Sequence, residues 1–374
     1  MKTLQSVLQK RDENSGTMIG WSSMSAFHAC ELKWALSELL PHPKGGIGID
    51  SGMSHALFVG SRIHDALRAW YHSDPTSVAD HDGGPITRRY DSDAGMQALR
   101  RSCDETRDAV ADDERWAEWK AESEQIWRRY AAECGPGGPD PETNYFVLAH
   151  DENGPLVERE FTVPLGYGDW FMSTRVDTIG WDIHNLPTTT HEGVIVIPEH
   201  KTSDVAMARG ALLDYALSGQ LSVETLAIKE CLGWQGQTLP IINLIKKRAA
   251  GEKIPLAERG LKGGLCRLWE PQTRTDFDLA KFKHDMVRRL KRMTLLVEEW
   301  KEHIRKGMDP LDAIYLVFDG NPERQTCAGQ GYQCFAYNLC LDKRVMRGSL
   351  LSTNPRFPAN EPRTGVQTLL EGVA

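Results

Sequence analysis

The chain has 374 residues, of which 40% are hydrophobic and 26% charged, an ordinary composition for one large globular domain or two modest ones. A mean hydropathy of −0.44 and the lack of an apolar run of about twenty residues argue against a membrane span. The formal net charge of −8 argues against wholesale wrapping of nucleic acid but leaves room for a local basic groove. The N-terminus lacks a secretory h-region, and eight cysteines in so long a chain do not resemble a secreted disulfide scaffold, so we expect a cytoplasmic protein.

Two helices are predicted near the start of the chain, after a loose lead over residues 1–20. The first covers residues 22–40 and is capped by Ser22 or Ser23, because hydroxyl side chains there can accept the free N–H groups of the first turn. A Gly-rich loop follows, and apolar periodicity predicts the second helix over residues 54–73.

Residues 75–144 are predicted to form a helical insertion. Its turn-rich start leads into a charged helical stretch, 96–134, and the segment CGPGGPDPETN, 134–144, is the clearest break in the chain. Three tryptophans of the stretch are spaced so that they can face a common core. They are Trp116, Trp119 and Trp127.

From residue 145 the hydrophobic pattern becomes strand-like, and residues 145–248 are predicted to form the catalytic sheet core. Several short apolar segments follow one another, then a helix over 210–232, then the apolar run TLPIINLIKK. Helices, a run of adjacent strands and further helices together predict an α/β fold.

A long basic helix is predicted over residues 276–306, followed by a cysteine-bearing segment, 318–341, and a polar tail, 346–374. We expect one domain over residues 21–345. The basic side chains of the helix can line a DNA groove, or they can form a plain solvated face. The candidates for DNA binding are Arg288, Arg289 and Arg292.

The segment VIVIPEHKTS, residues 194–203, reads as a buried strand that ends in charged residues. Because side chains alternate along a strand, Glu199 and Lys201 share one face and His200 points to the other. A preceding strand carries Asp177 and can pair with this one as a hairpin, so that Asp177 and Glu199 bind one divalent cation between them. The alternative is a surface hairpin with a simple Lys–Glu ion pair.

Two further polar residues accompany this strand. VGSRIH places Gly60 and His64 one turn apart on the same helix face, and the glycine permits the close approach of another part of the chain. Gln220 lies in the first turn of a helix that begins near Ser218. Each of these residues alone is unremarkable.

The order Gly-x-x-x-His, Asp, Glu-x-Lys, Gln resembles the RecB-like branch of the PD-(D/E)XK nucleases, which includes Cas4-like proteins and phage exonucleases. GSRIHDAL, RVDTIG, PEHKTS and SGQLSVE carry the resemblance, which spans roughly residues 20–345. It implies a restriction-endonuclease-like core, with a central mixed β-sheet flanked by helices. It also implies metal ligands, which are His64, Asp177, Glu199 and the backbone carbonyl of His200.

The resemblance implies further roles in the same site. Lys201 would position and activate the attacking water, and Gln220 would orient water or DNA. One residue departs from the pattern, since Glu224 stands where the family often has a tyrosine. This substitution puts DNA contacts by that helix in doubt.

The cysteines are unevenly distributed. Cys327, Cys334 and Cys340 lie within fourteen residues, whereas Cys30 lies far upstream. Clustered thiols in a reducing compartment more often bind metal than form disulfides, although buried thiols that cluster by chance are an alternative. The resemblance implies that these four cysteines hold a [4Fe–4S] cluster, and four thiolates can instead hold Zn²⁺.

Together these features predict a Mg²⁺- or Mn²⁺-dependent DNA exonuclease that acts on single strands or DNA ends in repair or recombination. The chain has no G-x-x-x-x-G-K-[ST] motif, so unwinding would come from a partner helicase. The protein would act in the host cytoplasm if it is encoded by a phage. The alternative is a module that binds or assembles on nucleic-acid ends without cleaving them.

Overall fold

The computed structural model describes residues 17–39, 54–73, 90–110, 112–151, 153–185, 193–203, 218–247 and 268–320. Contacts divide the chain into two compact units. The first, here called the sheet unit, contains Met1–Asn14, Met53–Val163 and Thr174–Leu279. The second, here called the helical unit, contains Ser15–Gly52, Pro164–Ser173 and Ala280–Ala374. No helix in the described ranges is both long enough and apolar enough to cross a membrane.

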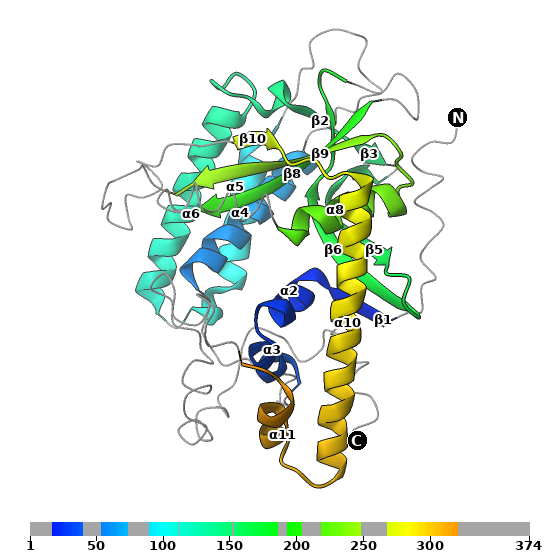
Figure 1. The fold of residues 1–374 in the computed structure, drawn as a ribbon. Helices are drawn as coiled ribbons and strands as arrows, with labels where there is room; N and C mark the ends of the chain where they lie inside the picture. Colours follow the sequence, from blue (N-terminus) through cyan, green and yellow to red (C-terminus); the bar gives the residue numbers. More distant parts are fainter. Residues whose placement is uncertain are drawn as a thin grey trace. The chain divides into compact units, whose positions relative to one another are not determined.

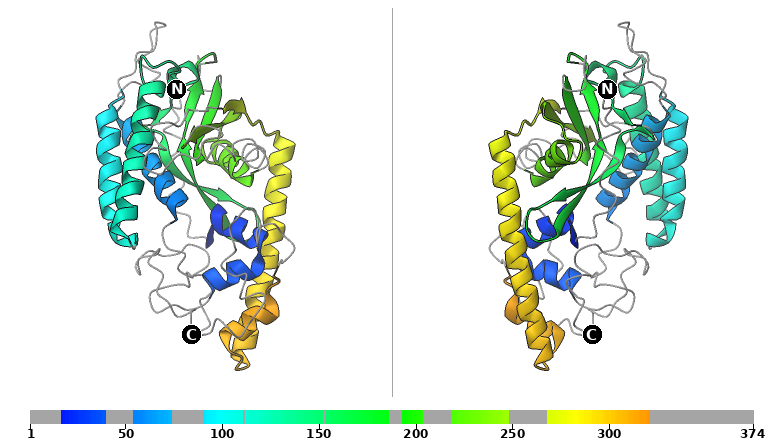
Figure 2. Two further views of the ribbon diagram at one scale, coloured as in Figure 1. Left: turned by 90° about the vertical axis from the view of Figure 1, so that its left-hand side faces the viewer. Right: turned by 90° about the vertical axis from the view of Figure 1, so that its right-hand side faces the viewer.

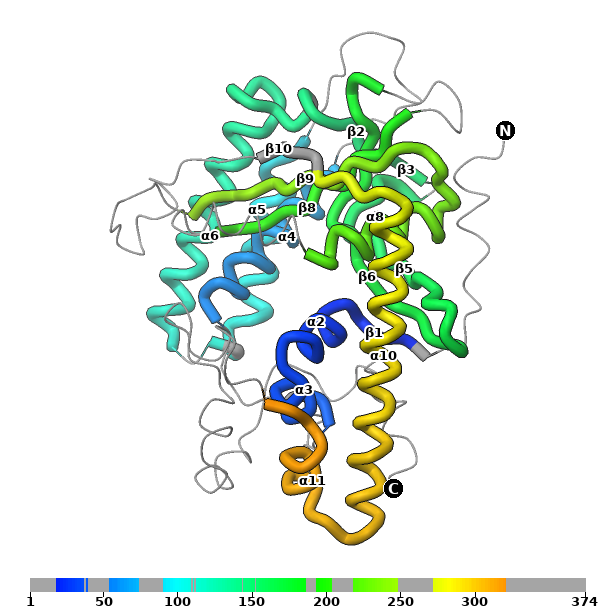
Figure 3. The backbone as a smooth tube through the Cα atoms, viewed as in Figure 1, coloured from blue at the N-terminus to red at the C-terminus, as the bar shows by residue number. Residues whose placement is uncertain are grey.

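The sheet unit is built on a five-stranded mixed sheet in the order β10-β9-β8-β7-β2. Its strands are β2 (Phe146–Leu148), β7 (Gly180–Asp182), β8 (Val194–Ser203), β9 (Gln237–Lys246) and β10 (Leu268–Pro271). β8 and β9 run side by side in the same direction over their whole length, whereas the other neighbours are antiparallel (Figure 3). The residues of β8 from Val194 to His200 are all buried, as expected for a central strand covered on both faces.

Helices cover both faces of this sheet (Figure 2). They are α4 (His55–His72), α5 (Ser92–Glu105) and α6 (Asp113–Cys134) on one face and α8 (Gly219–Cys231) on the other. The core beneath α4, α5 and α6 is rich in aromatic side chains. It includes Trp70 and Trp127, whose rings pack edge to face against each other, and Val196 of β8. Trp116 and Trp119 pack against the same core, which confirms the expected common face of the tryptophans.

Two helices of the sheet unit, α4 and α8, begin at a serine cap. The Ser54 hydroxyl accepts the Leu57 N–H at 3.2 Å, and the Ser218 hydroxyl accepts the Gln220 N–H at 3.0 Å. The charged stretch 96–134 divides into α5 and α6, with a 3₁₀ turn, η2 (Arg107–Ala109), before α6 begins.

Further strands precede β7 in the chain. They are β3 (His150–Asp151), β4 (Gly154–Pro155), β5 (Val157–Pro164) and β6 (Trp170–Thr178), and a 3₁₀ turn, η3 (Glu142–Asn144), precedes β2. β6 continues almost directly into β7, which pairs with β8 in antiparallel register. This is the hairpin that the sequence predicted (Figure 1).

The helical unit contains β1 (Thr17–Gly20), α2 (Trp21–Ala29), α3 (Glu31–Glu38), α11 (Pro310–Val317) and most of α10 (Asp276–Arg305). Within it, β1 pairs in parallel with the first residues of β6. The long helix predicted over residues 276–306 is confirmed as α10, and one face of it is apolar: Met286, Leu290, Met293 and Val297 are buried and Phe282 is half-buried.

The predicted single helix over residues 22–40 is wrong. The chain breaks at Cys30, whose backbone is extended (φ −165°, ψ 111°), and α2 begins after Gly20 without a side-chain cap. The Cys30 Sγ accepts the Lys33 N–H at 3.5 Å, so the sulfur caps α3 in place of the missing helical hydrogen bond. Apolar periodicity alone does not reveal such a break, because buried apolar residues recur at helical spacing on both sides of Cys30.

Candidate active site

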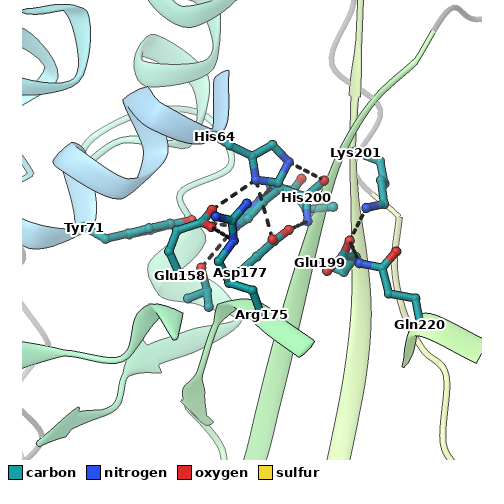
Figure 4. Close-up of polar contacts among 11 residues, drawn as sticks. His64, Tyr71, Glu158, Arg175, Asp177, Glu199, His200, Lys201 and Gln220 are labelled. Atoms are coloured by element: carbon teal, nitrogen blue, oxygen red, sulfur yellow. Dashed lines mark hydrogen bonds and ion pairs between the residues drawn. The ribbon is translucent and has the colours of Figure 1, made fainter. Parts of the chain in front are cut away.

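The end of β8 presents its charged residues on one face, as the alternation along the strand requires. Glu199 is almost completely buried, and the Lys201 Nζ donates to its Oε1. The Gln220 Nε2, from the first turn of α8, donates to the same oxygen at 2.6 Å (Figure 4). The three predicted residues therefore meet at one carboxylate.

Asp177 comes to this end of β8 through the β7–β8 register. Gly180 pairs with Val196, and continuing the antiparallel register places Asp177 opposite Glu199. The His200 N–H donates to the Asp177 Oδ2 at 3.0 Å, which holds the carboxylate against the backbone of β8. Two predicted acidic residues from neighbouring strands therefore face the same site.

His64 reaches the site from α4. Its Nδ1 lies 3.2 Å from the Glu158 Oε1 and 3.5 Å from the Asp177 Oδ1, and its Nε2 lies 3.1 Å from the His200 carbonyl oxygen (Figure 4). The predicted histidine, aspartate and backbone carbonyl are thus brought together.

Gly60, one turn before His64, brings α4 close to β8. A Cβ atom at this position would lie 3.4 Å from the Thr202 Oγ1, closer than most such contacts in proteins. The expected close approach at this glycine is therefore seen, and it sets the distance at which the His64 ring meets the strand.

Glu158, on β5, is a site residue that the sequence did not single out. Its backbone φ is 50°, which costs about 1–2 kcal/mol for a residue other than glycine, and its Oε2 lies 2.8 Å from the Arg175 Nε. The segment VEREF offers Glu158 and Glu160 two residues apart, so period-2 alternation cannot choose between them. Only the backbone irregularity directs Glu158 into the site, while Glu160 is exposed.

Three of these side chains suit a divalent cation. One ligand atom from each of His64, Glu158 and Asp177 lies within 4.8 Å of the others, and oxygen donors with one imidazole fit a hard or borderline cation. Among the described residues Glu199 does not belong to this group, and its Oε1 instead accepts from Lys201 and Gln220. That Asp177 and Glu199 share one cation stays a prediction.

The acidic surroundings shift the titration of the site. Burial alone would lower the pKa of His64, but Asp177 and Glu158 outweigh it and raise the pKa to about 9. Burial, followed by the charge of Asp177, raises the pKa of Glu199 to about 7. For Lys201, burial opposes the ammonium form, but the carboxylates of Glu199 and Asp177 raise its pKa above the ordinary value.

Cation binding should therefore depend on pH through His64. Below about pH 9 a proton occupies the imidazole that a cation needs, so the affinity for Mn²⁺ should rise with pH, by up to about tenfold per unit. Calorimetric titration of the protein with Mn²⁺ from about pH 6.5 to 9 measures this dependence. His64→Asn should make it shallower, and an equal slope in both proteins would contradict this role of His64.

On the opposite face of β8, the His200 side chain enters a buried polar network. The Asn243 Nδ2 lies 2.8 Å from its Nδ1, and the Tyr71 hydroxyl lies 3.2 Å from its Nε2. Tyr71 and Tyr130 both donate to the Glu142 Oε1, Tyr71 at 2.9 Å. Burial lowers the pKa of His200 well below its usual value, so the ring is neutral and its Nδ1 accepts from Asn243. The network anchors β8, the strand that carries Glu199 and Lys201.

Asn243→Leu should lower the free energy of unfolding by about 2–4 kcal/mol. The variant leaves the buried His200 Nδ1 without a donor and removes the contact with the Tyr130 hydroxyl at 2.6 Å. Urea denaturation measures the change. The control Asn144→Leu alters an exposed residue of η3 and should stay within about 0.5 kcal/mol of the natural protein. Equal stabilities of the two variants would show that the network contributes nothing.

Glu224, at the position where the resemblance expects a tyrosine, lies one turn beyond Gln220 on α8. Its side chain is fully buried. Burial raises its pKa well above the usual value, and the charges of Glu199 and Asp177 raise it further. This glutamate therefore belongs to the site and not to the surface.

Cys30 lies in the helical unit, where it is 7% exposed and lines a pocket of about 710 Å³. The other predicted cluster ligands lie outside the described residues. They are Cys327, Cys334 and Cys340.

The same pocket is lined by three arginines of α10, Arg288, Arg289 and Arg292. Arg292 forms ion pairs with Glu31, at 2.5 Å, and with Asp319, at 3.3 Å. Within the part of the chain that the structure describes, neither Arg288 nor Arg289 has an ion-pair partner. Of the predicted DNA-binding residues, these two therefore keep their charge available for a ligand.

A protein-family model covers the residues of this site. The model of the PD-(D/E)XK nuclease superfamily matches residues 20–332, which is most of the chain and includes every residue of the site described above. No curated protein gives a significant match. Members of the superfamily are metal-dependent nucleases, and their α/β fold is the one predicted from the sequence. The chain belongs to the PD-(D/E)XK nuclease superfamily.

Proposed function

We propose that the protein is a Mg²⁺- or Mn²⁺-dependent DNA exonuclease of the RecB-like, Cas4-like type, acting on single strands or DNA ends. The convergence of Asp177, Glu199 and Lys201 at one end of β8, beside His64, is the observation that carries the proposal. Retention of all four residues argues against the alternative, a non-cleaving end-binding module, since binding alone does not need them.

In phosphodiester hydrolysis the residues of the site would have separate roles. His64, Glu158 and Asp177 would hold the cation, with the His200 carbonyl beside them. When bound, a divalent cation lowers the pKa of its water and offsets the charge that develops on the phosphate. The raised pKa of Lys201 favours a charged ammonium that stabilises this charge over a neutral amine that removes a proton.

Gln220 has a positioning role in this proposal. Its amide donates to the Glu199 Oε1 that also accepts from Lys201, so it fixes the carboxylate and, through it, the direction of the ammonium. An amide is suited to this task because it donates a hydrogen bond without adding charge.

Incubation of the protein and Mn²⁺ with 5′- and 3′-labelled single-stranded DNA tests the proposal. We expect stepwise shortening from an end, with the label at that end released first as small products. Labelled fragments of intermediate length from both the 5′- and the 3′-labelled substrate, appearing before small products, would indicate endonuclease action. DNA that is bound but uncut at any Mn²⁺ concentration would overturn the proposal in favour of the end-binding module. A matched RNA substrate measures the preference for DNA.

We also propose that Cys30, Cys327, Cys334 and Cys340 hold a [4Fe–4S] cluster. Cys30 suits a cluster thiolate, because its sulfur accepts a backbone N–H and borders a pocket. The anaerobically purified protein should be brown, and Cys30→Ser should bleach it, whereas Cys103→Ser, which alters a buried cysteine of α5, should not. A colourless protein with stoichiometric Zn²⁺ would contradict the cluster.

The arginines of α10 give the proposal a separate test in DNA binding. The double variant Arg288→Ala/Arg289→Ala should flatten the dependence of log K on log salt by about 0.7 per lost phosphate contact on single strands. Arg292→Ala should change the slope less, since its guanidinium is already paired with Glu31 and Asp319. Fluorescence anisotropy over a salt series measures the slopes. An unchanged slope in the double variant would assign this helix face to solvent.

A further inference from the structure

The Glu224 carboxyl is buried, and no group among the described residues donates a hydrogen bond to it. Both of its oxygens lack a donor among the described residues, and the side chain is 0% exposed. The Glu199 Oε2 is likewise buried and lacks a donor there. Three carboxylate oxygens are thus removed from water with nothing in the described chain to replace it, which is costly for charged groups.

The two carboxyls face each other between α8 and β8. Gln220 and Glu224 lie one turn apart, so both project from the face of α8 that meets Glu199. Glu224 lies close enough to Glu199 and Asp177 for their charges to raise its pKa. Because Glu224 follows Gln220 by one turn and Gln220 donates to Glu199, the helix spacing directs the Glu224 carboxyl toward the same carboxylate.

Lys201 relieves this arrangement only in part, although its positive charge lowers the pKa of both Glu199 and Glu224. Its ammonium donates to the Oε1 of Glu199, the same atom that accepts from Gln220, and the Glu199 Oε2 has no donor among the described residues. The remaining oxygens of Glu199 and Glu224 can be satisfied together by a cation that both carboxylates bind or by a proton that they share.

We propose that Glu199 and Glu224 form a second divalent-cation site, distinct from the His64–Glu158–Asp177 group. Mg²⁺ and Mn²⁺ bind through one or two carboxylates and complete their shell with water and phosphate oxygens, which this pair can accommodate. A tyrosine at residue 224 would offer no carboxylate, so the site depends on this substitution. Its part in hydrolysis rests on the proposed function, whereas cation binding itself does not.

Counting bound Mn²⁺ tests the inference without reference to activity. Calorimetry and electron paramagnetic resonance on the full chain should show two tight Mn²⁺ ions whose signals are broadened by mutual coupling. Glu224→Gln, which keeps the shape of the side chain, should retain one ion with an uncoupled signal. Glu158→Gln should also retain one ion, at the other position. The control Glu105→Gln, at the exposed end of α5, should keep both.

The number of bound Mn²⁺ ions decides whether Glu199 and Glu224 form a second cation site. One tight ion in the natural protein, or two in Glu224→Gln, would overturn the inference and leave a proton shared between Glu199 and Glu224. If Glu224→Gln fails to fold, Glu224→Asp, which keeps the charge on a shorter side chain, should bind the second ion at least about tenfold more weakly, and unchanged affinity would refute the site. Two bound ions without nuclease activity would refute the proposed function alone, and one ion with activity would refute this inference alone.

Discussion

Lys201→Ala should reduce the rate constant for DNA hydrolysis by about 10³-fold at saturating Mn²⁺. Its ammonium is the cation nearest the Glu199 carboxylate, and the raised pKa of Lys201 keeps it charged at neutral pH. Removing one fixed donor from a buried site where charge develops costs on the order of 10²–10³ in kcat, and Lys201 also orients Glu199. Single-turnover cleavage of end-labelled single-stranded DNA measures the loss.

The matched control for this variant is Lys120→Ala. Lys120 donates to Asp104 at 2.6 Å on the surface of α6, so its removal should leave the rate unchanged. Visible absorption of the proposed cluster should be the same in both variants. Cleavage by Lys201→Ala within about tenfold of the natural rate would refute the assignment of the catalytic lysine.

Asp177→Asn should weaken Mn²⁺ binding at the His64–Glu158–Asp177 group by at least about 100-fold and abolish cleavage. Outer-shell partners of metal ligands already contribute about 10–100-fold, and a charged ligand should contribute more. The amide oxygen of Asn can still accept the His200 N–H, so the β6–β8 contact should persist. Mn²⁺ titration by calorimetry, together with the labelled-DNA assay, measures both effects.

A control variant and a stability measurement accompany Asp177→Asn. Asp108→Asn, in the exposed turn η2, should bind Mn²⁺ and cleave DNA like the natural protein. Urea denaturation of Asp177→Asn in the absence of metal should show that the fold is intact. Mn²⁺ affinity that is unchanged in a folded Asp177→Asn would place the cation elsewhere.

Local patterns in the sequence were sufficient for the elements that carry the catalytic motif. The β-branched run of β8 predicts a buried strand, and strict alternation then places Glu199 and Lys201 on one face and His200 on the other, as the structure has them. Ser54 and Ser218 mark the starts of α4 and α8, because a hydroxyl before an apolar period is the local solution to unpaired N–H groups. These features depend on neighbours within a few residues.

Other features depend on contacts between distant segments, and the sequence did not reveal them. Glu158 enters the site only through its left-handed backbone conformation, and Glu160 has the same strand parity. The break of the first helix at Cys30 reflects a sulfur cap and a shared core, neither of which changes the apolar period.

By itself, the sequence determined the α/β class and the strand that carries Glu199 and Lys201 on one face, since alternation along a strand is a local rule. That these residues are catalytic stays a proposal. Only the tertiary structure decided which carboxylates approach one another. It brought Glu158 to His64 and Asp177, and it buried Glu224 without a hydrogen-bond partner among the described residues, next to Glu199. The physical reason is that the burial of a carboxylate and its distance from other charges depend on how α4, α8 and β5 pack around the sheet. That packing depends on contacts between residues far apart in the chain, which local sequence patterns do not reveal.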